Sequence, residues 1–185
     1  MSLTLKILVF LVVSIALAWL TRSSLRSFRS HGFYRLFAWV AIVALVLLNL
    51  DSWFFRPFSI HQVISRLLLL TSLFLVFHGI WYLRMTGKPD SKRSDPSLIS
   101  IEKTTELVAV GAYRTIRHPL YSSLLFLAWG AFFKSPSPAG GGLAVLATVF
   151  LTATAKVEEV ENTRYFGAVY GEYMKHTKMF IPFVS

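Results

Sequence analysis

The stretch PLYSSLLFLAWGAFFKSPSPAGGGLAVLATVFLTATA, residues 119–155, decides the architecture of this chain. Two apolar runs, 119–133 and 139–155, flank the segment Lys134-Ser135-Pro136-Ser137-Pro138, whose composition is typical of a turn. Both runs are shorter than the roughly 20 residues that a membrane-spanning helix needs. The pattern therefore predicts a short, tight helical hairpin.

The composition points to a membrane protein. The chain has 185 residues, 55% of them hydrophobic and 15% charged, and a mean hydropathy of +0.58. A soluble domain carries about 25% charged residues, so this chain lacks the polar surface of a soluble globule. Three further apolar segments, 3–20, 36–50 and 63–82, precede the hairpin. We therefore expect an all-α integral membrane protein with five transmembrane helices and an amphipathic, cytoplasmic C-terminal helix.

The positive charges predict the orientation. Of the 19 Lys and Arg residues, 15 fall in segments 21–35, 84–117 and 156–185, which five crossings place on one side. Basic residues crowd cytoplasmic loops, so we expect the N-terminus outside, the C-terminus in the cytoplasm and the site facing the cytoplasm. The net charge of +10 is thus assigned to membrane topology and not to nucleic acid.

The chain is expected to fall into two parts. Residues 1–100 hold three transmembrane helices and a cytoplasmic loop, in which 87–100 is rich in turn-forming residues. Residues 101–185 hold a connector, the hairpin and the C-terminal helix. The chain has no cysteine, which excludes a disulfide framework, thiolate metal ligands and a cysteine nucleophile. The pattern predicts no metal site.

A basic cluster precedes the first helix of the hairpin. Pro119 suits the first turn of a helix, which places His118 at its N-cap, with Arg114 and Arg117 just before it. Helix amides, the helix dipole and two guanidinium groups then converge, which is an arrangement that binds anions. The same residues fit equally well a cluster of positive charges that flanks a membrane helix and contacts lipid headgroups.

An acidic cluster follows the second helix. Glu158, Glu159 and Glu161 lie within nine residues that we expect to begin a surface helix after the membrane span. Carboxylates at a membrane border are costly unless they are partnered or meet water. They fit either a solvated helix start or acceptors for an ammonium group or ribose hydroxyls. Further on, Phe166, Tyr170 and Tyr173 form an aromatic face suited to an interfacial helix.

A hairpin brings the start of its first helix close to the end of its second. Arg117 and His118 should therefore face Glu158 and Glu159 across one small site. Such a site fits a zwitterion that has a carboxylate and an ammonium group. The methionine part of S-adenosylmethionine has both.

The C-terminal part resembles a known family. The pattern G-x-Y-R-x-x-R-H-P-x-Y at 111–121, then E-E-x(6)-F-G-x-x-Y-x-x-Y at 158–173 and I-P at 181–182, is similar to the isoprenylcysteine carboxyl methyltransferases and their bacterial and phospholipid-methylating relatives. Leu107-Val108 also fits. The resemblance covers about the last 80 residues. Ala112, Asn162 and Met179 depart from the pattern, and the last two leave the substrate side open.

The resemblance implies a membrane-embedded enzyme that uses S-adenosylmethionine without a Rossmann domain. We expect His118 and Glu159 to be catalytic. The expected cofactor-binding residues are Leu107, Val108, Gly111, Tyr113, Arg117, His118, Tyr121, Glu158 and Glu159. The expected substrate is an amphiphilic, lipid-like carboxylate or thiol that enters from the bilayer past His78 and Trp81. Arg164 fits a residue that holds the acceptor carboxylate, and it fits a surface ion pair with Glu161 equally well.

Other readings remain open. Phospholipid amine methylation is the nearest enzymatic alternative, and a non-catalytic scaffold that keeps the fold is the alternative of another class. The family also shares a distant C-terminal pattern with longer membrane sterol reductases, which rank last.

Overall fold

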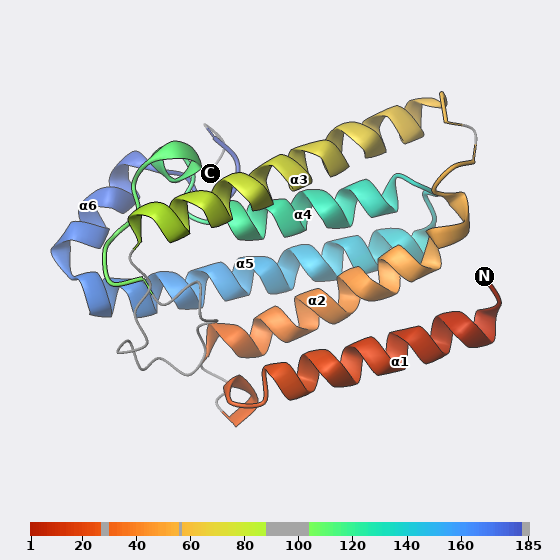
Figure 1. Ribbon diagram of the computed structural model, residues 1–185, viewed down its shortest axis with the longest axis horizontal. Helices are drawn as coiled ribbons and strands as arrows, with labels where there is room; N and C mark the ends of the chain where they lie inside the picture. The colour runs from red at the N-terminus through yellow and green to blue at the C-terminus, as the bar shows by residue number, and fades with distance from the viewer. Residues whose placement is uncertain (27–29, 56, 88–103, 183–185) are drawn as a thin grey trace.

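The computed structural model describes residues 1–26, 30–55, 57–87 and 104–182. Within these ranges, five helices run side by side as a bundle and a short sixth helix lies at one end (Figure 1). The helices are α1 (Leu3–Leu20), α2 (His31–Leu48), α3 (Ile60–Thr86), α4 (Pro119–Phe132), α5 (Pro138–Phe166) and α6 (Ala168–His176). Short 3-10 turns are η1 (Ser24–Arg26), η2 (Leu50–Ser52) and η4 (Gly111–Arg114).

Four of these helices, α1, α2, α3 and α5, are long and apolar enough to cross a membrane. The chain is therefore an all-helical integral membrane protein, as the composition predicts. Helix α4 has 14 residues, which extend for about 21 Å and fall short of the roughly 30 Å hydrocarbon core. It reaches only part of the way through the bundle, so the predicted fifth crossing stays a prediction.

All five expected apolar segments form helices, and the helix pair α4–α5 is the expected hairpin. The predicted end of the second hairpin helix at residue 155 is wrong, because α5 continues to Phe166. The acidic cluster therefore belongs to α5 and does not begin a separate surface helix. Charged side chains alone do not end a helix. Helix α5 stops at Gly167, whose φ of +64° leaves the right-handed helical region.

Polar side chains join the helices in the interior. Ser65 Oγ donates to the carbonyl of Gly130 at 2.7 Å, and Ser72 Oγ donates to that of Ser123 at 2.7 Å, so α3 is tied to α4 at two levels. Asn49 Nδ2 donates to the carbonyl of Ala131 at 2.8 Å. In lipid, such hydrogen bonds and close packing replace the hydrophobic effect as the forces that associate helices.

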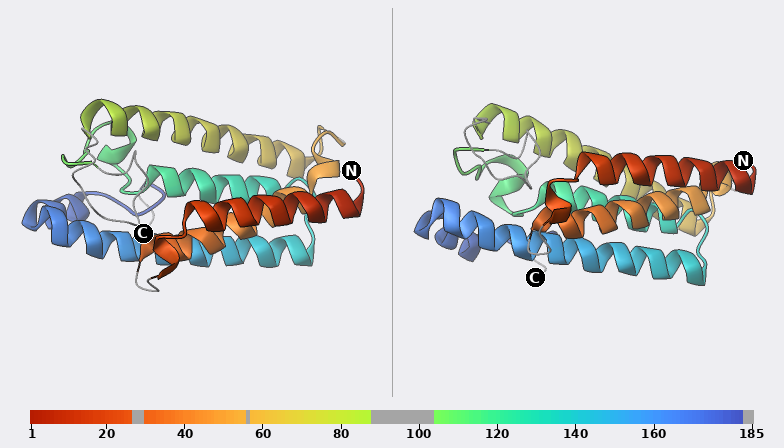
Figure 2. Two further views of the ribbon diagram at one scale, coloured as in Figure 1. Left: turned by 60° about the horizontal axis from the view of Figure 1, so that its bottom comes forward. Right: turned by 90° about the horizontal axis from the view of Figure 1, so that it is seen from below.

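Small residues allow α2, α4 and α5 to approach closely. The fully buried alanines of this interface are Ala38, Ala128, Ala131, Ala144, Ala147 and Ala155. Helix α1, by contrast, has no buried residue and lies along α2 at the edge of the bundle (Figure 2). The interface of α2 with α5 and that of α3 with α4 are the most extensive. These two interfaces fix the positions of the helix ends that lie next to α6.

The segment after α6 returns to the start of α4. Lys178 accepts from the amide of Arg117 at 2.7 Å and donates its own amide to Thr115 at 2.9 Å. The amide of His118 donates to the carbonyl of Met179 at 3.2 Å. This short parallel pairing fixes the backbone at residues 115–118. The expected loop 87–100, apart from Gly87, and the expected boundary between residues 100 and 101 lie outside the described residues.

Candidate functional site

The start of α4 is built as the sequence predicts. His118 is the N-cap residue and Pro119 occupies the first helical position. The His118 side chain does not cap the helix amides. Its ring instead stacks on Tyr121, with the ring centres 5.4 Å apart. The His118 side chain is 3% exposed, and Nε2 has no hydrogen-bond partner. A buried imidazole nitrogen that makes no hydrogen bond therefore lies at the helix start.

The connector before α4 depends on Gly111. This residue has a φ of +60°, which side chains other than glycine rarely adopt. A Cβ atom built on it would lie 2.3 Å from Cε2 of Tyr82, so the space beside it is also closed. Glycine thus lets the turn η4 approach α3, and this brings the neighbouring Val108 and Tyr113 into a buried cluster with Leu83.

Arg117 ties three elements together. Its Nε donates to Glu159 Oε1 at 2.6 Å, and both side chains are about nine-tenths buried. Its Nη1 donates to the carbonyls of Met174, at 3.2 Å, and Thr177. His118 Nε2 lies 3.4 Å from the same Glu159 oxygen without hydrogen-bond geometry. The basic and acidic clusters do meet, but Arg117 is held by protein groups.

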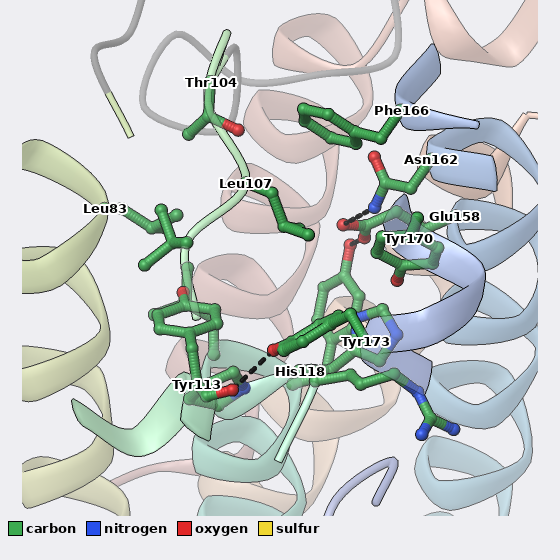
Figure 3. A pocket seen from close by; sticks show the side chains of 15 residues that line it. Leu83, Thr104, Leu107, Tyr113, His118, Glu158, Asn162, Phe166, Tyr170 and Tyr173 are labelled. Atoms are coloured by element: carbon green, nitrogen blue, oxygen red, sulfur yellow. Dashed lines mark hydrogen bonds between the residues drawn. The ribbon is translucent and has the colours of Figure 1, made fainter. Parts of the chain in front are cut away.

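Glu158 is the second carboxylate of the pair and faces the cavity. Tyr121 donates its hydroxyl to Glu158 Oε2 at 2.5 Å. Asn162, one helical turn further along α5, donates to Glu158 Oε1 at 3.5 Å (Figure 3). These donors leave the carboxylate partly buried and directed at the pocket, where it can accept from a ligand's ammonium or hydroxyl group.

Helix α2 supplies a further partner that the sequence analysis does not include. His31 is fully buried, and its Nδ1 lies 2.5 Å from Glu161 Oε2. The His31 amide also donates to Glu161 Oε1 at 3.4 Å. The positive end of the α2 dipole therefore meets the acidic end of α5. Two helix starts, those of α2 and α4, thus converge on the three carboxylates of one helix end.

A pocket lies between the connector, the α4 start, the end of α5 and α6 (Figure 3). Its enclosed volume is about 70 Å³, and its empty volume reaches about 600 Å³ when the open mouth is included. Ligand pockets commonly hold roughly 300–1,000 Å³. The cavity volume of about 70 Å³ lies below this range, so a ligand of nucleoside size would also occupy the open mouth and require the pocket to widen.

Aromatic rings form much of this pocket. The rings that line it are those of Tyr113, Tyr121, Phe166, Tyr170 and Tyr173. Burial raises the pKa of Tyr170 above its usual range, and the charge of Glu158 raises it further. Burial likewise raises the pKa of Tyr173, whose hydroxyl donates to the Tyr113 carbonyl at 2.6 Å. Both phenols therefore stay protonated at neutral pH, and the ring faces can attract a cation.

Most residues expected to bind a cofactor come together here. Those that line the pocket are Leu107, Val108, Tyr113, Arg117, His118, Tyr121 and Glu158. Gly111 shapes the connector behind it. Glu159 lies beneath the pocket and contacts Arg117 and His118. No group of three or more metal-ligating side chains occurs in the described parts of the chain.

The three residues expected to bind substrate do not lie at this pocket. His78 and Trp81 line a separate groove on α3, together with Phe74 and Phe77. Arg164 is exposed near the end of α5. Its expected alternative partner, Glu161, is instead bound by His31.

The sequence analysis did not include Asn162, Phe166, Tyr170 or Tyr173 among the site residues, although all four line the pocket. Residues 158, 162 and 166 recur at four-residue spacing and share one face of α5, which is a usable signal. The expected continuous aromatic helix across Phe166 is wrong, because Gly167 separates α5 from α6. The rings meet despite this break.

Comparisons with known proteins identify the family of this chain. A family model described as phospholipid methyltransferase matches residues 60–172, which is more than half of the chain. The chain belongs to the phospholipid methyltransferase family. The match includes α3, the connector, the hairpin and most of α6. The resemblance seen in the motifs is thereby confirmed.

Two curated relatives are similar to this family member. Protein-S-isoprenylcysteine O-methyltransferase B of Arabidopsis thaliana is 32% identical over 106 residues, which cover 56% of this chain and 54% of the relative. Methanethiol S-methyltransferase of Pseudomonas sp. (strain GM41(2012)) is 33% identical over 72 residues, which cover 38% of this chain and 26% of the relative. The matches therefore span about half of one relative and a quarter of the other. No solved structure matches the chain.

Proposed function

We propose that this chain is a membrane-embedded methyltransferase that uses S-adenosylmethionine and acts on a lipidic or isoprenylcysteine-like carboxylate or thiol. One observation carries the proposal: the α4 start and the carboxylates at the end of α5 meet at a single aromatic-lined pocket. The family and the two relatives, both named as methyltransferases, support this reading.

The residues at the pocket fit the chemical groups of the cofactor. Glu158 would accept from the ammonium or the ribose hydroxyls, since its carboxylate faces the cavity. His118 Nε2, which makes no hydrogen bond although Glu159 Oε1 lies 3.4 Å away, and the dipole at the start of α4 suit the methionine carboxylate. The tyrosine rings suit a sulfonium cation. Arg117 is already engaged, so Glu159 and Arg117 act here as positioning residues.

When bound, S-adenosylmethionine supplies a methyl group on a cationic sulfur, and the methyl transfers in line to a nucleophile. The residues of the pocket then have two tasks. The rings of Tyr113, Tyr121 and Tyr170 exclude water and hold the reacting groups in line. His118 and Glu158 fix the two ends of the methionine moiety. A carboxylate acceptor is ionised at neutral pH and needs no protein base.

Cofactor binding by purified protein in detergent tests the proposal. Calorimetry should detect binding of S-adenosylmethionine to the unaltered chain. Glu158→Gln should weaken it about tenfold or more, because a hydrogen bond to a charged group contributes about 1.5–3 kcal/mol. Glu172→Gln is the matched control, since Glu172 lies exposed on α6 and pairs with Lys175. Absence of binding at high cofactor concentration would favour the scaffold reading, and equal affinities in both variants would refute the site.

The acceptor class is tested by the dependence of methyl transfer on pH. An amine or a thiol must lose a proton before it attacks, so methylation of either should fall steeply as the pH decreases below neutrality. A carboxylate acceptor should keep its rate down to about pH 5, because its pKa is near 4. Labelled methyl transfer to membrane extracts, followed by mass spectrometry, identifies the acceptor. A labelled phospholipid amine would replace our proposal by the phospholipid alternative.

We also propose that the N-terminus lies outside and that the pocket faces the cytoplasm, as the distribution of Lys and Arg predicts. The chain has no cysteine, so single cysteines report topology without background. Pro136→Cys, in the exposed α4–α5 turn, should react with an impermeant maleimide on intact cells. Lys175→Cys, exposed on α6, should react only after the cells are opened. The reverse pattern would invert the orientation.

A further inference from the structure

An unusual positive charge lies at the end of the bundle opposite the pocket. Lys134, in the turn after α4, is 5% exposed. Its Nζ donates to Gln62 Oε1 at 3.1 Å and lies over the ring of Trp53, 5.4 Å from the ring centre. Among the residues that the structure describes, no carboxylate contacts it. The ammonium group is thus held by neutral oxygens and an aromatic face.

Arg66 adds a second cation at the same end. Its side chain is exposed on α3, donates from Nε to the carbonyl of Gln62 at 3.3 Å, and lies 5.8 Å from the ring centre of Phe58. Burial lowers the pKa of Lys134, and the charge of Arg66 lowers it further. Asp51 is the one carboxylate at this end within the described ranges, and Lys6 binds it at 2.7 Å. Neither Arg66 nor Lys134 has an anionic partner there.

A groove with apolar walls begins at Arg66. It has a volume of about 520 Å³ and runs between α3 and α4, which lie side by side in Figure 1. Its walls include Leu70, Leu73, Val76, Leu124 and Leu127. Almost all of the exposed wall is apolar, because Arg66 lines one end with the aliphatic part of its side chain, while its guanidinium lies beyond that end over Phe58. The groove therefore combines one cationic end with a long apolar trough.

The length of this groove matches one leaflet of a bilayer. Ten residues separate Arg66 from Val76 along α3, which is about 15 Å at the rise of an α-helix. Half of the hydrocarbon core is also about 15 Å thick. An acyl chain whose headgroup lies at Arg66 would thus follow the groove to the bilayer centre. Arg66 lies about 25 Å along α3 from Leu83 at the pocket, so this site is separate from the candidate active site.

We propose that the groove between α3 and α4 binds an anionic glycerophospholipid, whose phosphate pairs with Arg66 and whose acyl chain lies along Leu70, Leu73 and Val76. The ammonium group of Lys134 adds to the positive potential at the headgroup. The bound lipid compensates two cations that the described residues leave without an acidic partner. The guanidinium attracts the phosphate directly, and an anionic headgroup has no ammonium group of its own to offset that attraction, so it is favoured over a zwitterionic one.

Native mass spectrometry of the purified full chain tests the site. The chain is equilibrated in mixed micelles with dioleoyl phosphatidylglycerol or dioleoyl phosphatidylcholine, and the retained lipid is counted. We expect phosphatidylglycerol to be retained about fivefold more tightly, which corresponds to about 1 kcal/mol for one basic residue at a lipid headgroup. Arg66→Gln should abolish this preference. Arg84→Gln is the matched control, because it removes the same charge from the other end of α3 and should keep the preference.

Three results would overturn the proposal. Equal retention of the two lipids by the unaltered chain would remove the role of the anionic headgroup. Undiminished selectivity in Arg66→Gln would place the lipid elsewhere. Retention of glycerol 1-phosphate as strong as that of the full lipid would show that the acyl groove contributes nothing. None of these readouts uses cofactor binding or activity, so they are independent of the function proposed above.

Discussion

Replacing Arg117 by Met should destabilise the protein strongly, because it breaks the buried contact that joins α4, α5 and the segment after α6. Glu159, whose side chain is 11% exposed, would keep its charge without a guanidinium partner. The carbonyls of Met174 and Thr177 would lose a donor. Breaking one side of a buried ion pair costs about 3–5 kcal/mol. At about 2–4 °C per kcal/mol for a chain of this size, the melting temperature should fall by about 6–20 °C.

The measurement is thermal unfolding in detergent, followed by the intrinsic fluorescence of the five tryptophans. Arg114→Met is the matched control, because Arg114 is exposed on the same connector and its loss should change stability by less than about 0.5 kcal/mol. The double variant Arg117→Met with Glu159→Gln should melt above Arg117→Met alone, since it no longer buries an unpaired charge. An Arg117→Met protein that melts within about 2 °C of the unaltered chain would refute the reasoning.

Two further predictions concern the connector and the pocket. Gly111→Ala should lower the melting temperature more than Gly167→Ala: both positions have a positive φ, but only the first would drive a Cβ into Tyr82, and equal losses would contradict the role of that contact. Tyr121→Phe should weaken cofactor binding about tenfold in calorimetry, because Glu158 loses its shortest hydrogen bond, and an unchanged affinity would contradict the assignment of Glu158.

The hairpin and the meeting of its two ends were predictable because their signals are local. Pro119 marks a helix start, the run at residues 134–138 marks a turn, and two helices joined by a tight turn must bring their far ends together. The proximity of His118 to Glu159 follows from this topology. No long-range information is needed for it.

The end of α5 was harder to predict. Lys156 and the glutamates after it predict the end of the membrane helix, since charges are costly in lipid. A helix can nevertheless continue into the interfacial region, and the backbone changes direction only where Gly167 adopts a positive φ. Hydropathy therefore predicts where the chain leaves the apolar core of the membrane. The backbone conformation of Gly167 determines where the helix ends.

Contacts between distant segments could not be read from the sequence. His31 and Glu161 are 130 positions apart, and no periodicity relates them. Arg117 was predicted as an anion-binding residue from its place beside a helix start. Its guanidinium is occupied because α6 brings the carbonyls of Met174 and Thr177 to it, and the motif alone does not reveal that arrangement.

The pairing of residues 178–180 with the start of α4 has a consequence for biogenesis. Lys178 and Met179 accept from the amides of Arg117 and His118, and the Phe180 carbonyl accepts from Ser122 Oγ at 2.8 Å. The ribosome must release these residues before that hairpin end can be completed. The bundle can thus enter the bilayer helix by helix during translation, while the candidate site is completed afterwards. Nascent chains arrested before residue 178 should be inserted in the membrane but incompetent to hold a nucleoside.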